Sequence, residues 1–261
     1  MPDYLDILAK EAKKTVEEGY YNDTSQTETK AYHVSLKKAI IDCKKAPIIS
    51  EIKRSSPSEG DLRKEFDLKN IARDMDAGGA VGISVLTEPT FFKGNIEFIP
   101  IIREQVKTPI LMKDLIVDPV QIESGSRVGA NVVLLIHSLF SRGYCKNNIE
   151  EMIAYSHSRN LEVLLEVHTR DEFLSALETT ADMIGINNRN LETLQVDLKV
   201  TKQILTGYDN RNKVIISESG IKNGEDINFL RGCGAQAFLI GTSIMKFSDI
   251  RKKISSLVES L

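Results

Sequence analysis

The sequence predicts an α/β fold, a single (β/α)8 (TIM) barrel that carries an N-terminal helical extension. Eight short apolar runs, each rich in Val, Ile or Leu, recur along the 261 residues at a spacing of about 27, which suits one strand plus one helix. A helical pattern fills each gap, and one such barrel needs about 250 residues. The alternative is an open doubly wound sheet, but eight runs suit closure and no GxGxxG motif follows the first run.

The predicted strands are almost continuously apolar, which is typical of parallel strands that are covered on both faces. They are residues 47–52, 81–86, 109–115, 131–136, 161–167, 183–187, 213–219 and 237–241. Because no long linker separates them, we expect one catalytic barrel domain, residues 47–261. The extension is residues 1–46, with two amphipathic stretches, 4–18 and 34–44, on either side of a polar link at 22–29. We expect both stretches to pack as helices against the barrel.

The barrel helices carry recognisable start and stop residues. The pattern predicts a helix over 66–79 that ends at a Gly-Gly pair, and a final helix over 248–259. After the third strand, Asp118 is the expected cap, Pro119 the first helical residue and Gly129 the end. Thr169 with Glu172 predicts a capping box after the fifth strand. Asn223 is the expected cap of the helix after the seventh.

Composition and charge exclude several classes of function. The net charge is −3, so the sequence lacks the basic excess that nucleic-acid binding requires. The N-terminus has no apolar signal region, and the longest strongly apolar stretch, 132–136, is far short of the ~18 residues of a membrane span. The three cysteines form no CxxC pair and are expected to be reduced thiols. We expect a cytoplasmic protein without nucleic-acid or membrane partners, and a monomer as the simplest state.

Polar side chains end several predicted strands, all at the end where barrel active sites lie. They are Glu51, Lys53, Lys113, Glu166, Asn187, Arg189, Glu218 and Ser219. Side chains two apart share a face of a strand, so Glu51 and Lys53 should point the same way. Charges crowded in a barrel mouth must pair with one another or with a charged ligand. The three cations favour an anionic substrate, and the carboxylates beside lysines favour proton transfer.

The loops after the last two strands resemble a phosphate site. They contain Ser219 and Gly220 in SESGI, and Gly241 and Thr242 in IGTSIM. Loops at these positions commonly bind phosphate through glycine amides and a helix N-terminus. The loop over 54–60, with Ser56, allows either a simple turn or a substrate contact. Phe91 and Phe92, after the second strand, allow either ordinary core packing or contact with a planar substrate ring.

At these residues the sequence resembles the indole-3-glycerol phosphate synthase family. Seven segments in order carry the resemblance: IISEIKRSSPSEG (48–60), SVLTEPTFFKG (84–94), ILMKDLIVDPVQI (110–122), LLEVHT (164–169), IGINNRNL (184–191), ISESGI (216–221) and LIGTSIM (239–245). The family converts 1-(2-carboxyphenylamino)-1-deoxyribulose 5-phosphate into indole-3-glycerol phosphate, carbon dioxide and water during tryptophan biosynthesis. The resemblance therefore implies a carbon-carbon carboxy-lyase that binds a small phosphorylated anion. No residue of the first 46 is matched to a family motif.

The resemblance also implies roles for the matched residues. Lys113 is the general acid that protonates the ketone oxygen, and Lys53 meets the substrate carboxylate and acts in dehydration. Glu166 stabilises the cationic intermediate. Glu51 and Asn187 orient the chain hydroxyls and help proton transfer, and Arg189 and Glu218 belong to the polar network that holds the lysines. The implied contacts to phosphate and hydroxyls are Ser56, Ser219, Gly220, Gly241 and Thr242, and Phe92 lines the ring pocket. The chemistry needs neither a metal nor an organic cofactor, and the sequence has no HExxH, paired cysteine or Walker motif.

Two other functions are compatible with a phosphate-binding barrel. An isomerase such as phosphoribosylanthranilate isomerase needs a cysteine and an aspartate at strand ends, and no cysteine here ends a predicted strand. A barrel that binds a ligand without chemistry would lack some of Lys53, Lys113 and Glu166, and all three are present. The synthase reaction therefore remains the favoured hypothesis.

Overall fold

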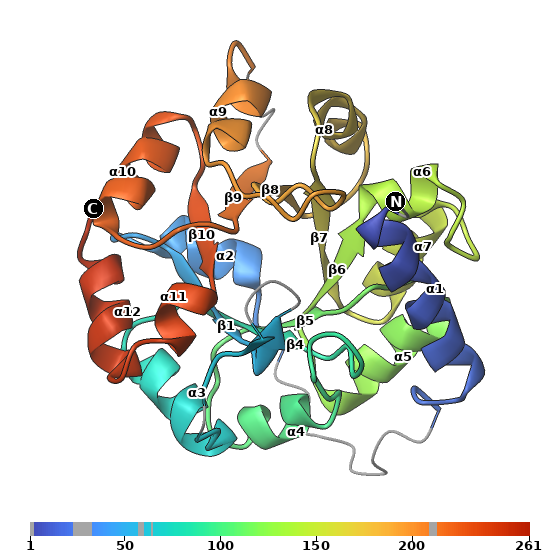
Figure 1. Ribbon diagram of the computed structural model, residues 1–261, viewed down its shortest axis with the longest axis horizontal. Helices are drawn as coiled ribbons and strands as arrows, with labels where there is room; N and C mark the ends of the chain where they lie inside the picture. The colour runs from blue at the N-terminus through green and yellow to red at the C-terminus, as the bar shows by residue number, and fades with distance from the viewer. Residues whose placement is uncertain (1–2, 23–32, 57–59, 64, 209–212) are drawn as a thin grey trace.

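Eight parallel strands close a barrel in the computed structural model, which describes residues 3–22, 33–56, 60–63, 65–208 and 213–261 (Figure 1). The order around the ring is β1-β10-β9-β8-β7-β6-β5-β4, and pairing of β1 with β4 closes it. The strands are β1 Ile48–Ile52, β4 Gly82–Leu86, β5 Ile110–Lys113, β6 Val132–Ile136, β7 Glu162–Val167, β8 Met183–Asn187, β9 Val214–Glu218 and β10 Ala237–Ile240. The predicted barrel is confirmed, and the open sheet is excluded.

The loop after β1 contains a feature that the sequence did not predict. A short antiparallel pair, β2 Ser55–Ser56 with β3 Gly60–Asp61, extends from the barrel rim. Gly60 has a φ of +64°, a left-handed conformation that glycine adopts without strain. Residues 57–59 of this loop lie outside the described part of the chain.

Helices ring the barrel, and several of them begin at a side-chain cap. They are α3 Leu68–Ala77, α4 Phe98–Arg103, α5 Pro119–Val128, α6 His137–Ser141, α7 Ile149–Ser158, α8 Arg170–Leu177, α9 Lys199–Leu205, α10 Gly224–Gly232, α11 Thr242–Met245 and α12 Ile250–Val258. Asp118 accepts the Val120 N–H at 2.9 Å and Gly129 closes α5 with a φ of 95°, as predicted. Asn223 also caps α10 as predicted.

The predicted capping box at α8 is only half formed. Thr169 accepts the backbone N–H of Glu172 at 3.2 Å, as expected. The Glu172 carboxylate does not return to Thr169; it accepts the backbone N–H of His168 at 2.7 Å and the Ser138 hydroxyl at 2.7 Å. Two strong donors therefore draw Glu172 toward the barrel.

Alternate strand residues build two separate cores. Inward positions such as Ile49, Leu111 and Ile216 fill the barrel interior, whereas outward positions such as Ile48 and Met112 pack under the helices. This alternation follows from the two-residue period of a strand. A polar residue two positions beyond an inward apolar residue therefore also points into the barrel, at its carboxyl end.

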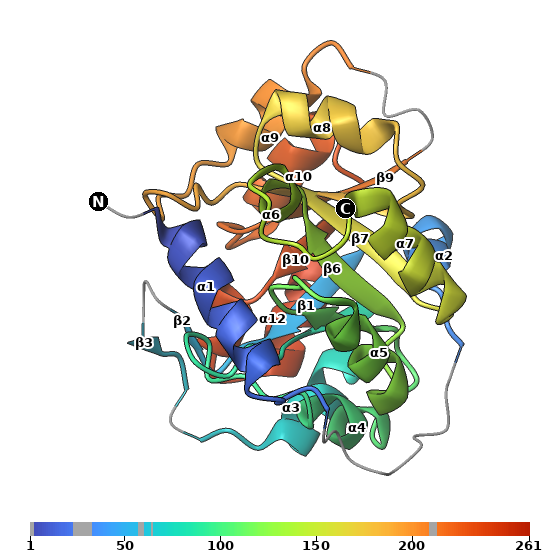
Figure 2. The same cartoon turned by 90° about the vertical axis from the view of Figure 1, so that its right-hand side faces the viewer.

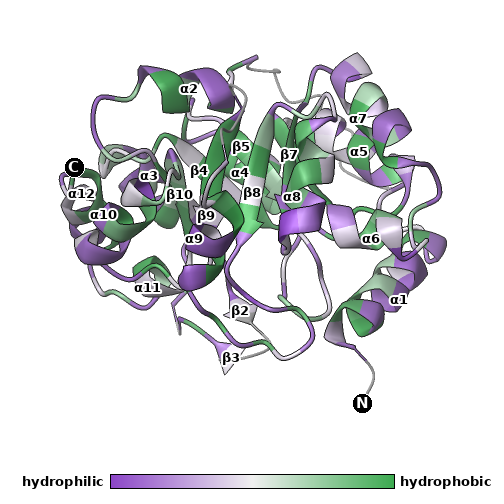
Figure 3. Cartoon of the chain, turned by 90° about the horizontal axis from the view of Figure 1, so that it is seen from above, coloured by the Kyte–Doolittle hydropathy of each residue, from purple (hydrophilic) through white to green (hydrophobic). Residues whose placement is uncertain are grey.

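The two helices of the extension lie at opposite ends of the barrel (Figures 2 and 3). Helix α1, Tyr4–Glu17, lies over the carboxyl ends of the strands, where Leu5 and Leu8 face a cavity. Helix α2, Leu36–Asp42, lies at the amino ends, where Leu36 joins the interior core. The two predicted extra helices are confirmed, and residues 23–29 of the polar link lie outside the described residues. No described helix is long and apolar enough to cross a membrane.

Candidate active site

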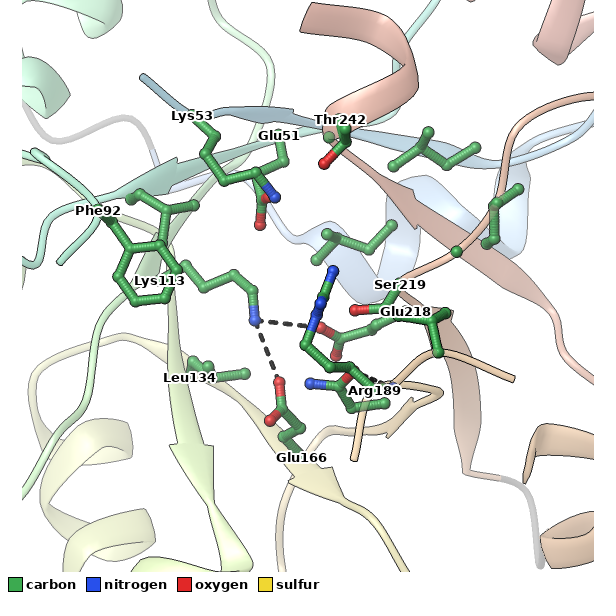
Figure 4. Close-up of a pocket in the computed structure, with 18 of the residues that line it drawn as sticks. Glu51, Lys53, Phe92, Lys113, Leu134, Glu166, Arg189, Glu218, Ser219 and Thr242 are labelled. Atoms are coloured by element: carbon green, nitrogen blue, oxygen red, sulfur yellow. Dashed lines mark hydrogen bonds and ion pairs between the residues drawn. The ribbon is translucent and has the colours of Figure 1, made fainter. Parts of the chain in front are cut away.

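A cavity of about 840 Å³ opens at the carboxyl ends of the strands, which we call the mouth of the barrel (Figure 4). Twelve of the residues expected at the site line it: Glu51, Lys53, Phe92, Lys113, Glu166, Asn187, Arg189, Glu218, Ser219, Gly220, Gly241 and Thr242. The thirteenth, Ser56, lies on β2, and its side chain is outside the described part of the structure.

The charged residues point inward because of their strand register. Lys113 follows Leu111 by two positions on β5, and Glu166 follows Leu164 by two on β7. Glu218 on β9 likewise follows Ile216. The same periodicity that builds the apolar layers thus places a charged layer above them. Glu166 and Glu218 are each only 1% exposed, so these charges depend on one another for stabilisation.

Lys113 lies between two carboxylates. Its Nζ is 3.1 Å from Glu166 Oε2 and 3.2 Å from Glu218 Oε2. Burial alone would lower the pKa of Lys113, but Glu166, Glu218 and Glu51 outweigh it and raise that pKa above its ordinary value. Lys113 is therefore protonated at neutral pH, which is the form a proton donor needs.

The two carboxylates beside Lys113 differ in acidity. Burial would raise the pKa of Glu166, but Lys113 and His168 outweigh it and hold that pKa well below its usual range. Burial raises the pKa of Glu218 to about 7, with Lys113 opposing and Glu166 adding to the rise. Near neutral pH, Glu166 is therefore the anion and Glu218 is poised to gain or release a proton.

A second ion pair lies at the end of β1. Lys53 Nζ is 2.7 Å from Glu51 Oε1, and both side chains are largely buried. The Glu51 carboxylate also lies against Gly241, where an added Cβ would come within 2.4 Å of Oε1. Gly241 is therefore needed for the close approach of this carboxylate.

The loop after β9 has a strained, well-supported backbone. Ser219 and Gly220 both have positive φ values, +68° and +86°, and for serine this conformation is uncommon. The amide of Asn188 holds the loop, since its Nδ2 donates to Glu218 O at 2.9 Å and to Ser219 O at 3.2 Å. The loop therefore presents its hydroxyl and glycine to the cavity in one fixed arrangement.

Arg189 and Asn187 are held by local contacts at the end of β8. Asn187 Oδ1 accepts the backbone N–H of Arg189 at 2.9 Å, and Arg189 Nη1 donates to Leu194 O at 3.0 Å. Asn187 also hydrogen-bonds to Glu166 and helps to lower its pKa. These contacts bring a guanidinium to the rim of the cavity, opposite Lys53 (Figure 4).

The two phenylalanines after β4 have different surroundings. Phe92 lines the cavity, whereas Phe91 packs edge-on against Tyr4 of α1, with ring centroids 6.0 Å apart. Glu88 accepts the backbone N–H groups of both residues, at 2.7 Å from Phe91 and 2.9 Å from Phe92. Packing is therefore the role of Phe91, whereas contact of Phe92 with a substrate ring stays a prediction.

This arrangement of lysines, carboxylates and rim hydroxyls agrees with a family match over nearly the whole chain. The family model described as "Indole-3-glycerol phosphate synthase" matches residues 5–257. The chain belongs to the indole-3-glycerol phosphate synthase family. Membership places it among the decarboxylating lyases of tryptophan biosynthesis and confirms the resemblance seen in the sequence.

Individual members of the indole-3-glycerol phosphate synthase family show the same relationship. The enzyme of Methanocaldococcus jannaschii is 45% identical over 227 residues, covering 85% of this chain and 82% of its own. That of Caldanaerobacter subterraneus subsp. tengcongensis is 42% identical over 212 residues, covering 80% and 79%. That of Aliarcobacter butzleri is 38% identical, covering 82% and 80%.

Two solved structures share the fold at low identity. A thiamine phosphate pyrophosphorylase from Pyrococcus furiosus has a TM-score of 0.61 and 16% identity, covering 87% of this chain and 97% of its own. An N-acetylmannosamine-6-phosphate 2-epimerase from Clostridium perfringens has a TM-score of 0.58 and 15% identity, covering 81% and 91%. These likenesses concern the barrel fold alone.

Several residues at this synthase-family site were missed by the sequence analysis. His168 lies 3.3 Å from Glu166, and Asn188 supports the Ser219 loop. Gly185 leaves room for Glu218, since an added Cβ would lie 2.1 Å from its Oε1. The position of His168 two residues after Glu166 is the one sequence feature that could have indicated it. Among the described residues, no cluster of His, Cys, Asp and Glu could hold a metal ion.

Proposed function

We propose that the mouth of this barrel converts 1-(2-carboxyphenylamino)-1-deoxyribulose 5-phosphate into indole-3-glycerol phosphate, carbon dioxide and water. The observation that carries the proposal is the position of Lys113, whose ammonium group lies between Glu166 and Glu218 inside a cavity rimmed by Lys53 and Arg189. A protonated lysine at the bottom of a cavity that also carries Lys53 and Arg189 suits a reaction that protonates a ketone on an anionic substrate.

The first step is ring closure. The benzene carbon that bears the carboxylate attacks the ketone carbon, and a carbon-carbon bond forms while Lys113 gives a proton to the ketone oxygen. The ring loses its aromaticity and the aniline nitrogen becomes an iminium cation. Glu166, ionised beside Lys113, stabilises this positive charge by electrostatic attraction.

The second and third steps restore the aromatic system. Carbon dioxide leaves, and the electrons of its bond return to the ring. The new hydroxyl then departs as water, as a proton is lost from the neighbouring carbon. The Lys53–Glu51 pair, 2.7 Å apart, supplies an acid and a base for this dehydration. Lys53 also meets the substrate carboxylate, while Asn187 orients chain hydroxyls.

The remaining contacts bind the two ends of the substrate. Ser219, Gly220, Gly241 and Thr242 bind the phosphate, together with Ser56. Phe92 contacts the benzene ring, while Arg189 and Glu218 complete the polar surroundings of the lysines. A dianionic phosphate at the rim and a ring near Phe92 would place the ketone toward Lys113. The proposed reaction uses neither a metal nor an organic cofactor.

An indole fluorescence assay tests the proposal directly. The carboxyphenylamino substrate is added to purified protein, and the indole product is expected to appear with time. Lys113→Met should lower turnover by about three orders of magnitude or more while the protein stays folded. Absence of product with the wild-type chain would overturn the proposal.

A lysine at the other end of the barrel provides the matched control. Lys213 Nζ donates to Thr179 O at 2.9 Å and to Ala181 O at 2.6 Å. Lys213→Met should reduce stability without reducing turnover. A large loss of stability in Lys113→Met instead would mean that Lys113 has a structural role.

The proposal extends to organisation and location. We infer one barrel domain, residues 47–261, with residues 1–46 packed on it, acting as a cytoplasmic monomer on a small molecule and not on nucleic acid. The interior core that contains Leu36 and the Tyr21–Asp114 hydrogen bond of 2.9 Å support a single unit. Light scattering should give about 29.2 kDa and urea unfolding one transition. A mass of twice that value would contradict the monomer.

A further inference from the structure

We propose that His168 is a positioning residue for the reaction: held by Glu172 on its outer side, it orients the Glu166 carboxylate toward Lys113. The inference deepens the function proposed above and rests on it. Neither His168 nor Glu172 lines the cavity. Their effect on the reaction would therefore pass through Glu166.

The geometry places one cation on each oxygen of Glu166. His168 comes two residues after Glu166, just beyond the end of β7, so the two side chains lie on the same side of the chain. His168 Nε2 is 3.3 Å from Glu166 Oε1, and Lys113 Nζ is 3.1 Å from Oε2. The carboxylate is therefore restrained from two sides, and rotation away from Lys113 would break its contact with His168.

Glu172 supplies the outer support from helix α8. Its Oε2 is 3.7 Å from His168 Nδ1 and accepts the backbone N–H of His168 at 2.7 Å. Its Oε1 accepts the hydroxyl of Ser138 on α6 at 2.7 Å. The main-chain donor of His168 and the hydroxyl donor from α6 thus fix Glu172, and a continuous series runs from Glu172 through His168 and Glu166 to Lys113.

The charges in this series alternate in sign. The side chain of His168 is only 12% exposed, and its two ring nitrogens face carboxylates, Nε2 toward Glu166 and Nδ1 toward Glu172. Burial would lower the pKa of His168, but Glu166 on β7 and Glu172 on α8 outweigh it and raise that pKa to about 9. His137 on α6 also faces Glu172, at 4.0 Å; burial lowers the pKa of His137, with Glu172 opposing this shift and His168 adding to it.

A cationic His168 has two consequences for the reaction. It helps to hold the pKa of Glu166 below its usual range, so that Glu166 is ionised when the iminium cation forms. It also removes the rotational freedom that Glu166 would otherwise have, which preorganises the charge beside Lys113. Both effects concern the transition state more than substrate binding, so kcat should respond more than KM.

Two kinetic variants test the inference. His168→Asn should lower kcat roughly tenfold to a hundredfold and change KM by no more than about twofold. Losses of this size are typical when a residue that orients a catalytic group, without touching the substrate, is removed. The acid limb of the kcat profile should move to higher pH. His168→Lys, which keeps a cation, should restore kcat to within about fivefold of the wild type. An unchanged kcat and profile in folded His168→Asn would overturn the inference.

A second histidine-carboxylate pair is the matched control. His157 Nε2 is 2.8 Å from Asp182 Oδ2, on the surface and away from the cavity. His157→Asn should leave kcat and the pH profile unchanged. If His168→Asn does not fold, Glu172→Gln is the alternative variant, because its amide oxygen can still accept the backbone N–H of His168. Glu172→Gln should also lower kcat and shift the pH profile of kcat. An unshifted pH profile in this variant would count against the inference.

A titration without substrate separates this inference from the proposed function. The ring of His168 is followed by NMR in the free protein, where a pKa near 9 is expected. Glu172→Gln should lower that pKa toward the ordinary value. A wild-type value near ~6.5 would overturn the positioning role even in an active enzyme. Absence of indole product with a His168 pKa near 9 would instead contradict only the proposed reaction.

Discussion

Strand β7 has a glutamate at each end, and the two have opposite surroundings. At the amino end, which we call the base of the barrel, Glu162 Oε2 accepts the N–H groups of Leu36 and Lys37 at 2.8 and 3.2 Å. At the mouth, Glu166 lies beside Lys113 and His168. The first carboxylate binds the first turn of helix α2, whose Leu36 side chain packs into the interior core. The second holds a charge where a cation would develop during the reaction.

The difference shows how one barrel separates stability from chemistry. At the base, a carboxylate meets backbone donors and the positive end of the α2 dipole, an arrangement that stabilises the fold. At the mouth, ionised groups are buried against one another, so each relies on its partners to replace lost solvation, and the arrangement provides reactive charge. Substitutions at the base should therefore alter unfolding and leave turnover unchanged, whereas those at the mouth should alter turnover.

Within this comparison, the largest expected effect comes from exchanging the two glutamates separately for glutamine. Glu166→Gln should lower kcat/KM by about 10²–10³, because the neutral amide no longer stabilises Lys113 or a cationic intermediate. Glu162→Gln should leave turnover unchanged and lower the free energy of unfolding by about 1–2 kcal/mol. The measurements are indole fluorescence and urea denaturation. Equal losses of turnover in both variants would break the comparison.

The pH dependence of stability should reveal the buried imidazolium at the mouth. The folded-state pKa of His168, about 9, exceeds the ordinary ~6.5, so its stabilisation is complete below pH ~6.5 and is lost as pH rises through 9. Between these values the free energy of unfolding should fall by up to about 3 kcal/mol. Urea denaturation at several pH values measures this slope.

His168→Asn is the control for that slope and should flatten it. His157→Asn, at the exposed pair, should keep the wild-type slope. If the free energy of unfolding of His168→Asn still falls between pH ~6.5 and 9, a group other than His168 causes the pH dependence. The raised pKa of Glu218, about 7, acts mostly at lower pH and is shared by all three proteins.

Substitution of one glycine at the mouth and one at the base should have effects of intermediate size. In Gly185→Ala the new Cβ would lie 2.1 Å from Glu218 Oε1, so that carboxylate must move and turnover should fall roughly tenfold. In Gly82→Ala at the base, the new Cβ would lie 2.6 Å from Leu36 Cδ1 and should reduce stability by about 1 kcal/mol with normal turnover. Turnover and urea denaturation are measured on both variants, and normal turnover in Gly185→Ala would contradict the prediction.

The smallest expected effect lies beside the mouth, where Asp114 follows Lys113 at the end of β5 and lines the cavity. Tyr21 donates to Asp114 at 2.9 Å, and burial raises the pKa of Asp114 to about 6, with Thr87 and Tyr21 opposing. Tyr21→Phe should reduce the free energy of unfolding by about 1 kcal/mol and raise the pKa of Asp114 further. Turnover should change little, which a standard assay checks; a large loss would place this bond within the catalytic machinery.

Much of the mouth could be predicted because strand periodicity is visible in the sequence. Lys113, Glu166 and Glu218 each end an apolar run, and a polar residue at the carboxyl end of a barrel strand lies at the mouth. The capping residues of α5 and α10 were equally readable, since their geometry is local. The resemblance to family motifs added the roles.

Other features depend on contacts between distant segments, which spacing alone does not encode. Gly185 reads as an ordinary strand residue until Glu218, 33 positions later, is placed against it. Glu172 was expected to complete a local capping box, but His168 and Ser138 compete for it. The different surroundings of Phe91 and Phe92 depend on where α1 lies.

The closed ring has a consequence for how this protein aggregates. Pairing of β1 with β4 leaves the eight-stranded sheet without a free edge within the described residues. An unpaired edge is what lets one chain add strands from another, so a native barrel of this kind offers little template for such growth. Fraying of α1 or of a surface loop does not expose one. Aggregation on heating should therefore begin only once the ring itself opens, and its onset should track global unfolding.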